Sequence, residues 1–193
     1  MIRVLAHLVA LLPFIYYLQG AFRQQLGADP QEVLLHGMGI WSLRFLLACL
    51  MVTPLRSFFR WPKLIHYRRM LGLYFAFYLA LHILIYLWFF LGWEWSMIAS
   101  ELVKRPYLTV GIIAAILTVP LVVTSTNKAR RWLKRRWNTL HKLIYPIGFL
   151  AVVHFYWQVK ADINEPLIYV LIYTFLMVYR IWLKYSQKSS QKA

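Results

Sequence analysis

The chemistry of this chain centres on its histidines, which are His7, His36, His66, His82, His141 and His154. His82 and His154 lie deep within apolar segments, where an ionisable side chain is costly and therefore marks a candidate functional site. Two neutral imidazoles that face each other can each give a ring nitrogen to one axial position of a haem iron. An iron with both axial positions filled transfers electrons and binds no substrate directly. The pair therefore predicts a b-type haem.

The depths of these histidines predict which of them meet. His82 lies about 12 residues into the segment 70–92, or roughly 18 Å along a helix. His154 lies about 15 residues, or roughly 22 Å, into the segment 139–158, which begins on the same side. His141 stands at the edge of that segment, about 20 Å from His154 along the helix axis. We therefore expect His82 and His154 to share one site.

Other residues near these segments have a structural interpretation beside a functional one. His141 could belong to a second chromophore or could cap the start of its helix. Pro146 has no N–H, so it predicts a kink that could bring the rings of His141 and His154 to one side. His36 lies near the periplasmic end of the second apolar segment, 33–53, and could line a quinone pocket. A histidine in a membrane helix is also often only a hydrogen-bonded structural residue.

Three arginines could bind the anionic groups of a cofactor. Arg44 is the basic side chain near mid-membrane, and it could pair with a haem propionate, with backbone carbonyls or with lipid phosphate. Arg68 and Arg69 stand at the mouth of the segment 70–92 and could hold propionates or phosphate. They could equally serve to stop translocation of that segment.

The composition predicts which elements position these side chains. Apolar residues make up 61% of the 193 residues and charged residues 15%, against about 45–50% and about 25% in soluble proteins. This excludes a soluble enzyme and a disordered regulator, and the single Cys49 excludes both an intrachain disulfide and covalently attached haem. We predict an all-α, polytopic membrane helix bundle in a single domain over 1–193, since a span needs about 20 apolar residues. Its six transmembrane helices are expected at about 3–20, 33–53, 70–92, 107–124, 139–158 and 166–184.

The basic residues predict the orientation of the bundle. The net charge is +16, and the Lys and Arg residues stand between apolar segments, so we expect no nucleic-acid partner. Sixteen of them fall at the N-terminus, in loops 54–69 and 125–138 and in the C-terminal tail, where there is no acidic residue. Four lie on the opposite side together with all six acidic residues. This asymmetry predicts cytoplasmic termini, with the basic face against anionic lipid or an acidic electron donor.

Motifs for other cofactors are missing from the sequence. No P-loop is present, and no Gly-x-Gly-x-x-Gly follows a strand. The loops are too short for a soluble flavin or nicotinamide domain. Electrons must therefore come from a separate donor, either quinol or a soluble flavin reductase at the basic face.

Several stretches, taken in order from about residue 11 to 171, resemble a known family. They are Leu11-Leu12-Pro13-Phe14, Leu26-Gly27-Ala28-Asp29-Pro30, His36-Gly37, Leu43-Arg44-Phe45-Leu46-Leu47-Ala48, Thr53-Pro54-Leu55, Arg68-Arg69-Met70-Leu71-Gly72-Leu73 with His82, Arg105-Pro106-Tyr107-Leu108-Thr109-Val110-Gly111, Thr124-Ser125-Thr126, Arg136-Trp137-Asn138-Thr139-Leu140-His141 with Tyr145, and His154 with Trp157. The chain resembles the haem-binding membrane subunits of the bacterial periplasmic methionine sulfoxide reductase system. These subunits belong to the ferric-reductase-like transmembrane superfamily.

This resemblance implies a role in electron transfer. It implies that the chain passes electrons from the quinone pool to a periplasmic molybdopterin-dependent methionine sulfoxide reductase, which repairs oxidised proteins. It carries over His82, His141 and His154 as haem-site residues, and it implies FMN as a further cofactor. The superfamily's two-haem ladder needs four histidines on the third and fifth spans. This chain supplies three, so one haem b is expected and a second is left open.

Two alternatives use the same histidines. One is a cation or proton transporter, although the sequence shows neither an internal repeat nor intramembrane acidic residues. The other is a two-haem, quinone-linked cytochrome of another family, which would need two matched pairs of histidines. A visible spectrum with a haem count separates the first alternative from an electron carrier, because a transporter is colourless.

Overall fold

The computed structural model describes residues 2–190, with side chains for 4–186, and every regular element within them is a helix. The elements are α1 Ile2–Phe22, α2 Pro30–Phe58, η1 Pro62–Leu64, α3 Ile65–Ile85, the π-helical η2 Tyr86–Phe90, α4 Trp95–Lys104, α5 Pro106–Val123, α6 Asn127–Leu133, α7 Arg135–Leu140, η3 His141–Leu143, α8 Ile144–Gln158 and α9 Asn164–Ser190. The predicted all-α class is therefore confirmed.

Five stretches of the described chain are long and apolar enough to cross a membrane. They are Val4–Phe22, Pro30–Phe58, Pro62–Phe90, Pro106–Val123 and Asn164–Ser186. Each corresponds to one of the predicted segments, although the second and third are longer than expected. The remaining predicted segment, 139–158, is divided among the end of α7, the 3₁₀ turn η3 and α8, which alone has 15 residues.

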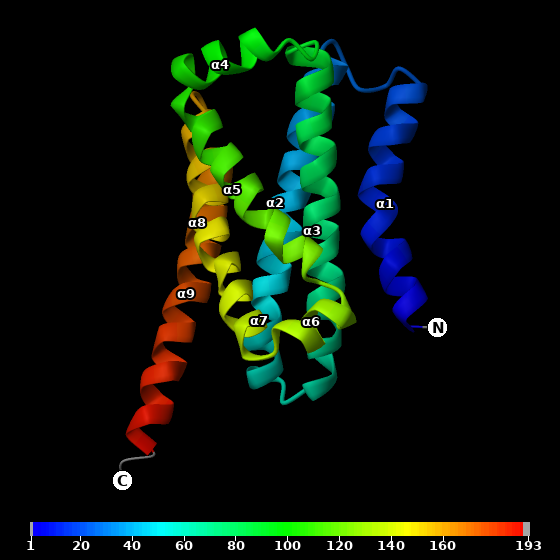
Figure 1. Cartoon of the computed structure of the whole chain (residues 1–193). Helices are drawn as coiled ribbons and strands as arrows, with labels where there is room; N and C mark the ends of the chain where they lie inside the picture. The colour runs from blue at the N-terminus through cyan, green and yellow to red at the C-terminus, as the bar shows by residue number, and fades with distance from the viewer. Residues whose placement is uncertain (1, 191–193) are drawn as a thin grey trace.

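The bundle is built around two helix pairs (Figure 1). The helices α2 and α3 pack against each other most extensively, followed by α5 and α8. The helix α9 covers α8 and α2 on one flank, and α1 stands on the opposite flank. The core between the pairs is formed by buried side chains of α2, α3, α8 and α9, such as Leu46, Tyr78, Ile147 and Leu176.

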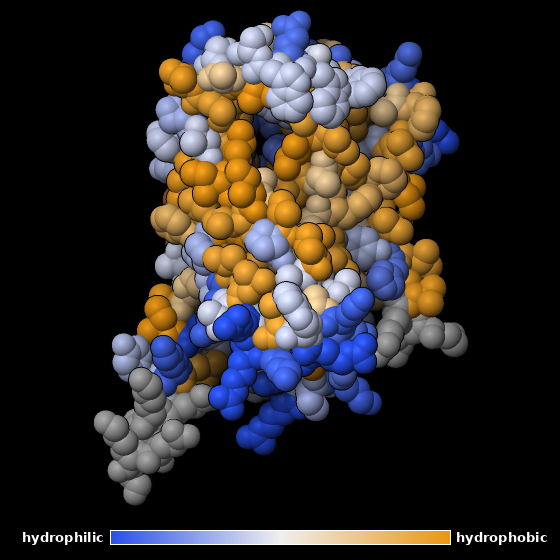
Figure 2. Space-filling model, viewed as in Figure 1, coloured by the Kyte–Doolittle hydropathy of each residue, from blue (hydrophilic) through white to orange (hydrophobic). Residues whose placement is uncertain are grey.

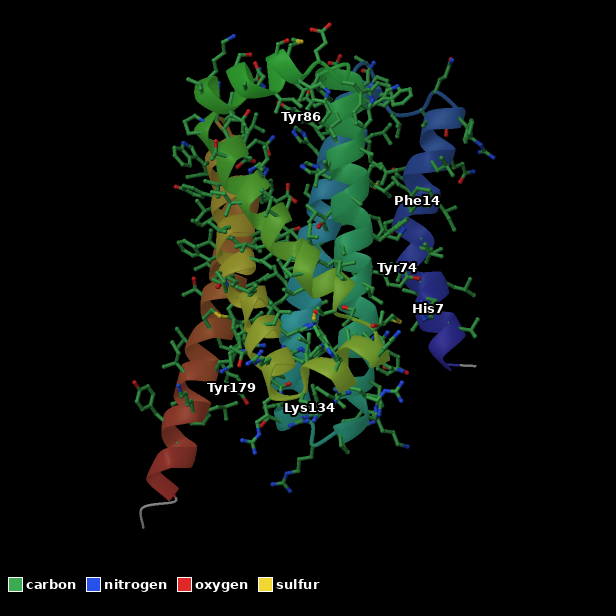
Figure 3. All side chains as sticks on the ribbon, viewed as in Figure 1. His7, Phe14, Tyr74, Tyr86, Lys134 and Tyr179 are labelled. Carbon is green, nitrogen blue, oxygen red and sulfur yellow. The ribbon has the colours of Figure 1, made fainter. Side chains whose placement is uncertain are left out.

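A tyrosine ties α1 to the rest of the bundle. The Tyr78 hydroxyl donates to the Ala10 carbonyl at 2.8 Å and accepts from the Phe14 N–H at 3.1 Å. This carbonyl and this N–H would otherwise bond each other in the helical ladder, so the hydroxyl enters the ladder beside Pro13. A second contact joins His7 Nδ1 to Tyr74 Oη at 3.0 Å, and Figure 3 shows these residues between α1 and α3.

Two features at the ends of the bundle differ from the predicted segments. Loop 93–106 contains α4, a short helix that lies across one end of the bundle (Figure 1). At the opposite end the helix is interrupted at His141–Leu143, just before Pro146. Pro146 cannot bond the Lys142 carbonyl, which explains why the regular α-helix begins only at Ile144.

The charges divide between these two ends as the sequence indicates. Hydrophilic side chains gather around α6 and α7, below a wide hydrophobic zone (Figure 2). This end carries the basic run from Lys128 to Arg136. Three other basic residues of the predicted cytoplasmic side, Arg3, Lys188 and Lys192, lie outside the side chains that the structure describes.

Candidate functional site

The structure brings His82 and His154 together between the two helix pairs. The ring centroids are 6.4 Å apart and the ring planes are 82° to each other. His82 comes from α3 and His154 from α8, so each helix pair contributes one imidazole. The two residues are separated by a large distance in sequence but lie at the same level of the bundle, as their depths predict.

A backbone carbonyl holds each of these rings by the same nitrogen. His82 Nδ1 lies 2.9 Å from the Leu35 carbonyl oxygen, and His154 Nδ1 lies 2.7 Å from the Tyr107 carbonyl oxygen. A carbonyl only accepts, so both Nδ1 atoms carry the proton. The lone pair of each neutral ring therefore lies on Nε2, which is the state that a metal ligand requires.

A cavity of about 510 Å³ contains both histidines. Its walls are largely apolar and include Phe75, Leu79, Tyr86 and Phe155. Figure 2 shows an opening through the hydrophobic surface below α4, and Figure 3 places Tyr86 at that end of the bundle. The volume is within the range of about 300–1,000 Å³ that is typical of cofactor pockets.

The separation of the rings fits axial ligation of one metal ion. A histidine nitrogen lies about 2.0–2.1 Å from its metal and about 1.2 Å from its own ring centre, so two axial imidazoles have ring centres about 6.4 Å apart. Across the described residues no group of three or more His, Cys, Asp or Glu side chains is placed to hold a metal ion. A macrocycle supplies the other four ligands itself, so a pair of histidines in an apolar cavity suits haem and not a bare ion.

The mouth of the cavity is polar. Glu101 and Arg105 form an ion pair with an N–O distance of 2.9 Å, and Gln158 Nε2 lies 2.6 Å from His36 Nε2. His36 and Arg105 both line the cavity, and Arg105 is the one Lys or Arg side chain among its lining residues. A hydrogen bond with the Tyr107 side chain raises the pKa of the Arg105 guanidinium above its ordinary value and outweighs the opposing effect of burial. Arg105 therefore remains cationic beside the opening.

The structure places Arg44 away from this cavity. Its Nε donates to Tyr169 Oη at 2.8 Å, and its Nη2 lies 3.8 Å from a Glu165 carboxylate oxygen. The guanidinium also stacks over the Trp41 ring at 4.8 Å. Arg44 thus joins α2 to α9 and does not line the cavity.

His141 lies at the end of the bundle opposite the cavity mouth. Its ring stacks on Trp137 with centroids 3.8 Å apart, and its Nε2 lies 3.0 Å from Thr124 Oγ1. His141 is not among the residues that line the cavity of His82 and His154.

Arg68 and Arg69 lie at the same end as His141. The Arg68 carbonyl accepts from Cys49 Sγ at 3.3 Å, and Arg69 Nη1 donates to Asn127 Oδ1 at 2.8 Å. Arg69 therefore ties α3 to α6. Neither arginine lines the cavity that contains His82.

Sequence reasoning missed several residues of the cavity. Arg105 is not among the candidate site residues of the sequence, although its place directly before Pro106 marks the start of a helix. Gln158 carried no signal, since a glutamine near a segment end is ordinary. The carbonyls of Leu35 and Tyr107 could not be found from residue types, because every residue has one.

Comparisons with known proteins find one family and several relatives. Residues 37–153 match the family described as "Ferric reductase like transmembrane component". The chain is 51% identical over 163 residues to a protein of Xanthomonas campestris pv. campestris (strain B100), and this alignment covers 84% of this chain and 75% of the relative. It is 43% identical over 181 residues to a protein of Polaromonas naphthalenivorans (strain CJ2), and this alignment covers 92% of this chain and 83% of the relative. Both relatives are named protein-methionine-sulfoxide reductase heme-binding subunit MsrQ, and no solved structure matches.

Proposed function

The chain belongs to the ferric reductase-like transmembrane family, among the haem-binding subunits of protein-methionine-sulfoxide reductase, and we propose that it is a b-type cytochrome of a bacterial inner membrane. In this proposal it carries electrons across the membrane to a periplasmic molybdopterin-dependent methionine sulfoxide reductase. The observation that carries the proposal is the pair His82 and His154, with ring centroids 6.4 Å apart in an apolar cavity.

The two histidines hold the haem in this proposal. His82 and His154 present Nε2 because their Nδ1 atoms donate to the carbonyls of Leu35 and Tyr107. The apolar walls exclude water and keep both imidazoles neutral. When bound, haem supplies an iron that accepts and releases one electron at a time.

Arg105 is the residue we assign to the propionates. It lines the cavity at the mouth, and its present partner Glu101 belongs to the neighbouring α4. A guanidinium matches a carboxylate with two parallel hydrogen bonds. Arg44, Arg68 and Arg69, the candidates that the sequence offers for this role, do not line the cavity.

We also propose six membrane spans with both termini in the cytoplasm. The fifth span in chain order, which is not among the five long apolar helices, is formed by α7, η3 and α8, which together run from Arg135 to Gln158. This places α4 and the cavity mouth in the periplasm, on the side of the partner enzyme. The basic end around α6 and α7 then faces the cytoplasm, where it meets anionic lipid.

The electron donor is part of the same proposal. Quinol reaches the chain from the lipid phase, and a soluble flavin reductase would reach it at the basic cytoplasmic end. His141, stacked on Trp137 at that end, is the residue we assign to a second chromophore, either a further haem or FMN. The family resemblance supports this assignment.

A difference spectrum with a haem count tests the proposal. The purified chain is expected to give the reduced-minus-oxidised spectrum of a low-spin b-type haem, and His82→Ala and His154→Ala are each expected to abolish it. His7→Ala is the matched control, because His7 bonds Tyr74 at 3.0 Å between α1 and α3 and does not line the cavity. A colourless protein, or a full low-spin spectrum in either cavity variant, would contradict the proposal.

A further inference from the structure

Two glycines stand against the histidines of the cavity. A Cβ atom at Gly39 would lie 3.0 Å from His82 Nδ1, and a Cβ atom at Gly111 would lie 2.8 Å from His154 Nδ1. The distance at Gly111 is one that real Cβ atoms essentially never show, and the distance at Gly39 is tighter than nine in ten real Cβ contacts, so the imidazole must give way in both alanine variants. Each imidazole therefore occupies space that only a glycine leaves open.

Each glycine lies one helical turn after the residue whose carbonyl holds the same ring. Leu35 and Gly39 lie four residues apart in α2, and so do Tyr107 and Gly111 in α5. In a helix the side chain of residue i+4 lies on the same face as residue i and leans back over it. A side chain at Gly39 or Gly111 would thus cover the carbonyl from the side at which the imidazole arrives. The absence of a side chain makes an internal helix carbonyl available to a side-chain donor.

The two arrangements of carbonyl, glycine and histidine have the same spacing in the sequence. Both hydrogen bonds join residues 47 positions apart, and in both the glycine is four positions after the carbonyl. The α2–α3 pair carries one copy and the α5–α8 pair carries the other, and these are the two most extensively packed pairs of the bundle. The two helix pairs therefore hold their histidines with the same spacing, and the cavity contains both rings.

We propose that Gly39 and Gly111 are matched positioning residues for the haem, each giving one axial imidazole its carbonyl partner and its orientation. This inference rests on the proposed function, because it assigns the two rings to one iron. A hydrogen bond from Nδ1 to a carbonyl increases the electron density on the ring and thereby strengthens its donation to a metal. Two rings held in this way would be equivalent, strongly donating ligands for the iron of a bound haem.

Alanine substitutions test the glycines directly. Gly39→Ala and Gly111→Ala are each expected to lower the amount of bound haem and to raise the midpoint potential of the haem that remains, because a weaker ligand stabilises the ferric state less. Gly72→Ala is the matched control, since its Cβ would meet only Cys49 Sγ at 3.8 Å, an ordinary contact. Haem content and potential that stay at the wild-type values in both cavity variants would overturn the inference.

A second measurement leaves both glycines in place and does not depend on the folding of the alanine variants. In His82→Gly, free imidazole is expected to restore the low-spin spectrum, because it can donate to the Leu35 carbonyl as the side chain does. Free 1-methylimidazole has no N–H to donate, so its complex is expected to form at higher ligand concentration and to have a higher potential. Equal affinities and equal potentials for the two ligands would overturn the inference.

These outcomes separate the inference from the proposed function. A wild-type protein that binds no haem would overturn both. A wild-type protein that binds haem through His82 and His154, with no response to the alanine variants or to the missing N–H, would overturn the positioning role alone.

Discussion

Thr124 and His141 are joined by a contact of 3.0 Å between Oγ1 and Nε2, at the end of the bundle opposite the cavity. The Thr124 hydroxyl donates to the Pro120 carbonyl at 2.6 Å, so the His141 Nε2 carries the proton in this contact. The cavity histidines are protonated on Nδ1 instead. His141 is thus held by its Nε2 atom, whereas the two cavity histidines are held by their Nδ1 atoms.

We predict that His141→Ala leaves the haem of the cavity intact and slows its reduction by quinol. The reason is that this ring lies outside the cavity, stacked on Trp137. Difference spectra with dithionite measure the haem content, and difference spectra with a short-chain quinol measure the donor step. Reduction by quinol at the full wild-type rate would exclude His141 from electron transfer, and loss of the cavity haem would show that it acts as a ligand there.

The angle between the cavity rings predicts an electronic signature. The ring planes are 82° apart. A haem iron bound by both imidazoles at this angle would have its orbitals split very little, so the ferric protein is expected to show a highly anisotropic low-spin signal with one large g value. Low-temperature electron paramagnetic resonance of the oxidised protein measures this. A rhombic signal of the kind given by parallel imidazoles would contradict the orientation described here.

The sequence predicted the meeting of His82 and His154 because depth in a membrane helix depends on residue count alone, at about 1.5 Å per residue. The surroundings of Arg44 could not be predicted in the same way. The direction in which a side chain points around its helix depends on how neighbouring helices pack, and here Arg44 points to Tyr169 of α9.

The parts of the fold that the sequence missed have a common cause. The helix α4 is short and carries both polar and apolar residues, so it has no long apolar run that would distinguish it from a loop. The matched spacing around His82 and His154 depends on two glycines and two carbonyls, and a pattern of so few residue types is invisible against the surrounding apolar sequence. In both cases the signal lies in three-dimensional placement and not in composition.

Arg105 provides a test of the cavity mouth. We predict that Arg105→Ala retains the low-spin spectrum and lowers the midpoint potential of the haem, because removing a cation near the propionates favours the more positive ferric state. Arg105→Lys keeps the charge and is expected to retain most of the wild-type potential. Redox titration measures both variants, and a potential that is the same in wild type and Arg105→Ala would remove Arg105 from the haem site.

Arg44 is predicted to stabilise the bundle without holding the haem. Its bond to Tyr169 Oη, at 2.8 Å, connects α2 to α9, and hydrogen bonds to charged groups contribute about 1.5–3 kcal/mol. Because the Arg44 side chain is partly exposed, we expect Arg44→Ala to cost about 1–2 kcal/mol of unfolding free energy. Tyr169→Phe removes the same bond, so the double variant should be less destabilised than the sum of the single ones. Loss of haem from Arg44→Ala at an unchanged melting temperature would instead assign Arg44 to the cofactor.

The orientation of the bundle can be tested with single cysteines. The native Cys49 is only 4% exposed, so it is expected to give little background with a membrane-impermeant maleimide. Ser96→Cys lies on the exposed side of α4 and Lys128→Cys on α6, at opposite ends of the bundle. In intact spheroplasts the variant at position 96 should be labelled at once, and the variant at position 128 only after the membrane is permeabilised. The reverse pattern would place the basic end in the periplasm, against the charge asymmetry from which the orientation is inferred.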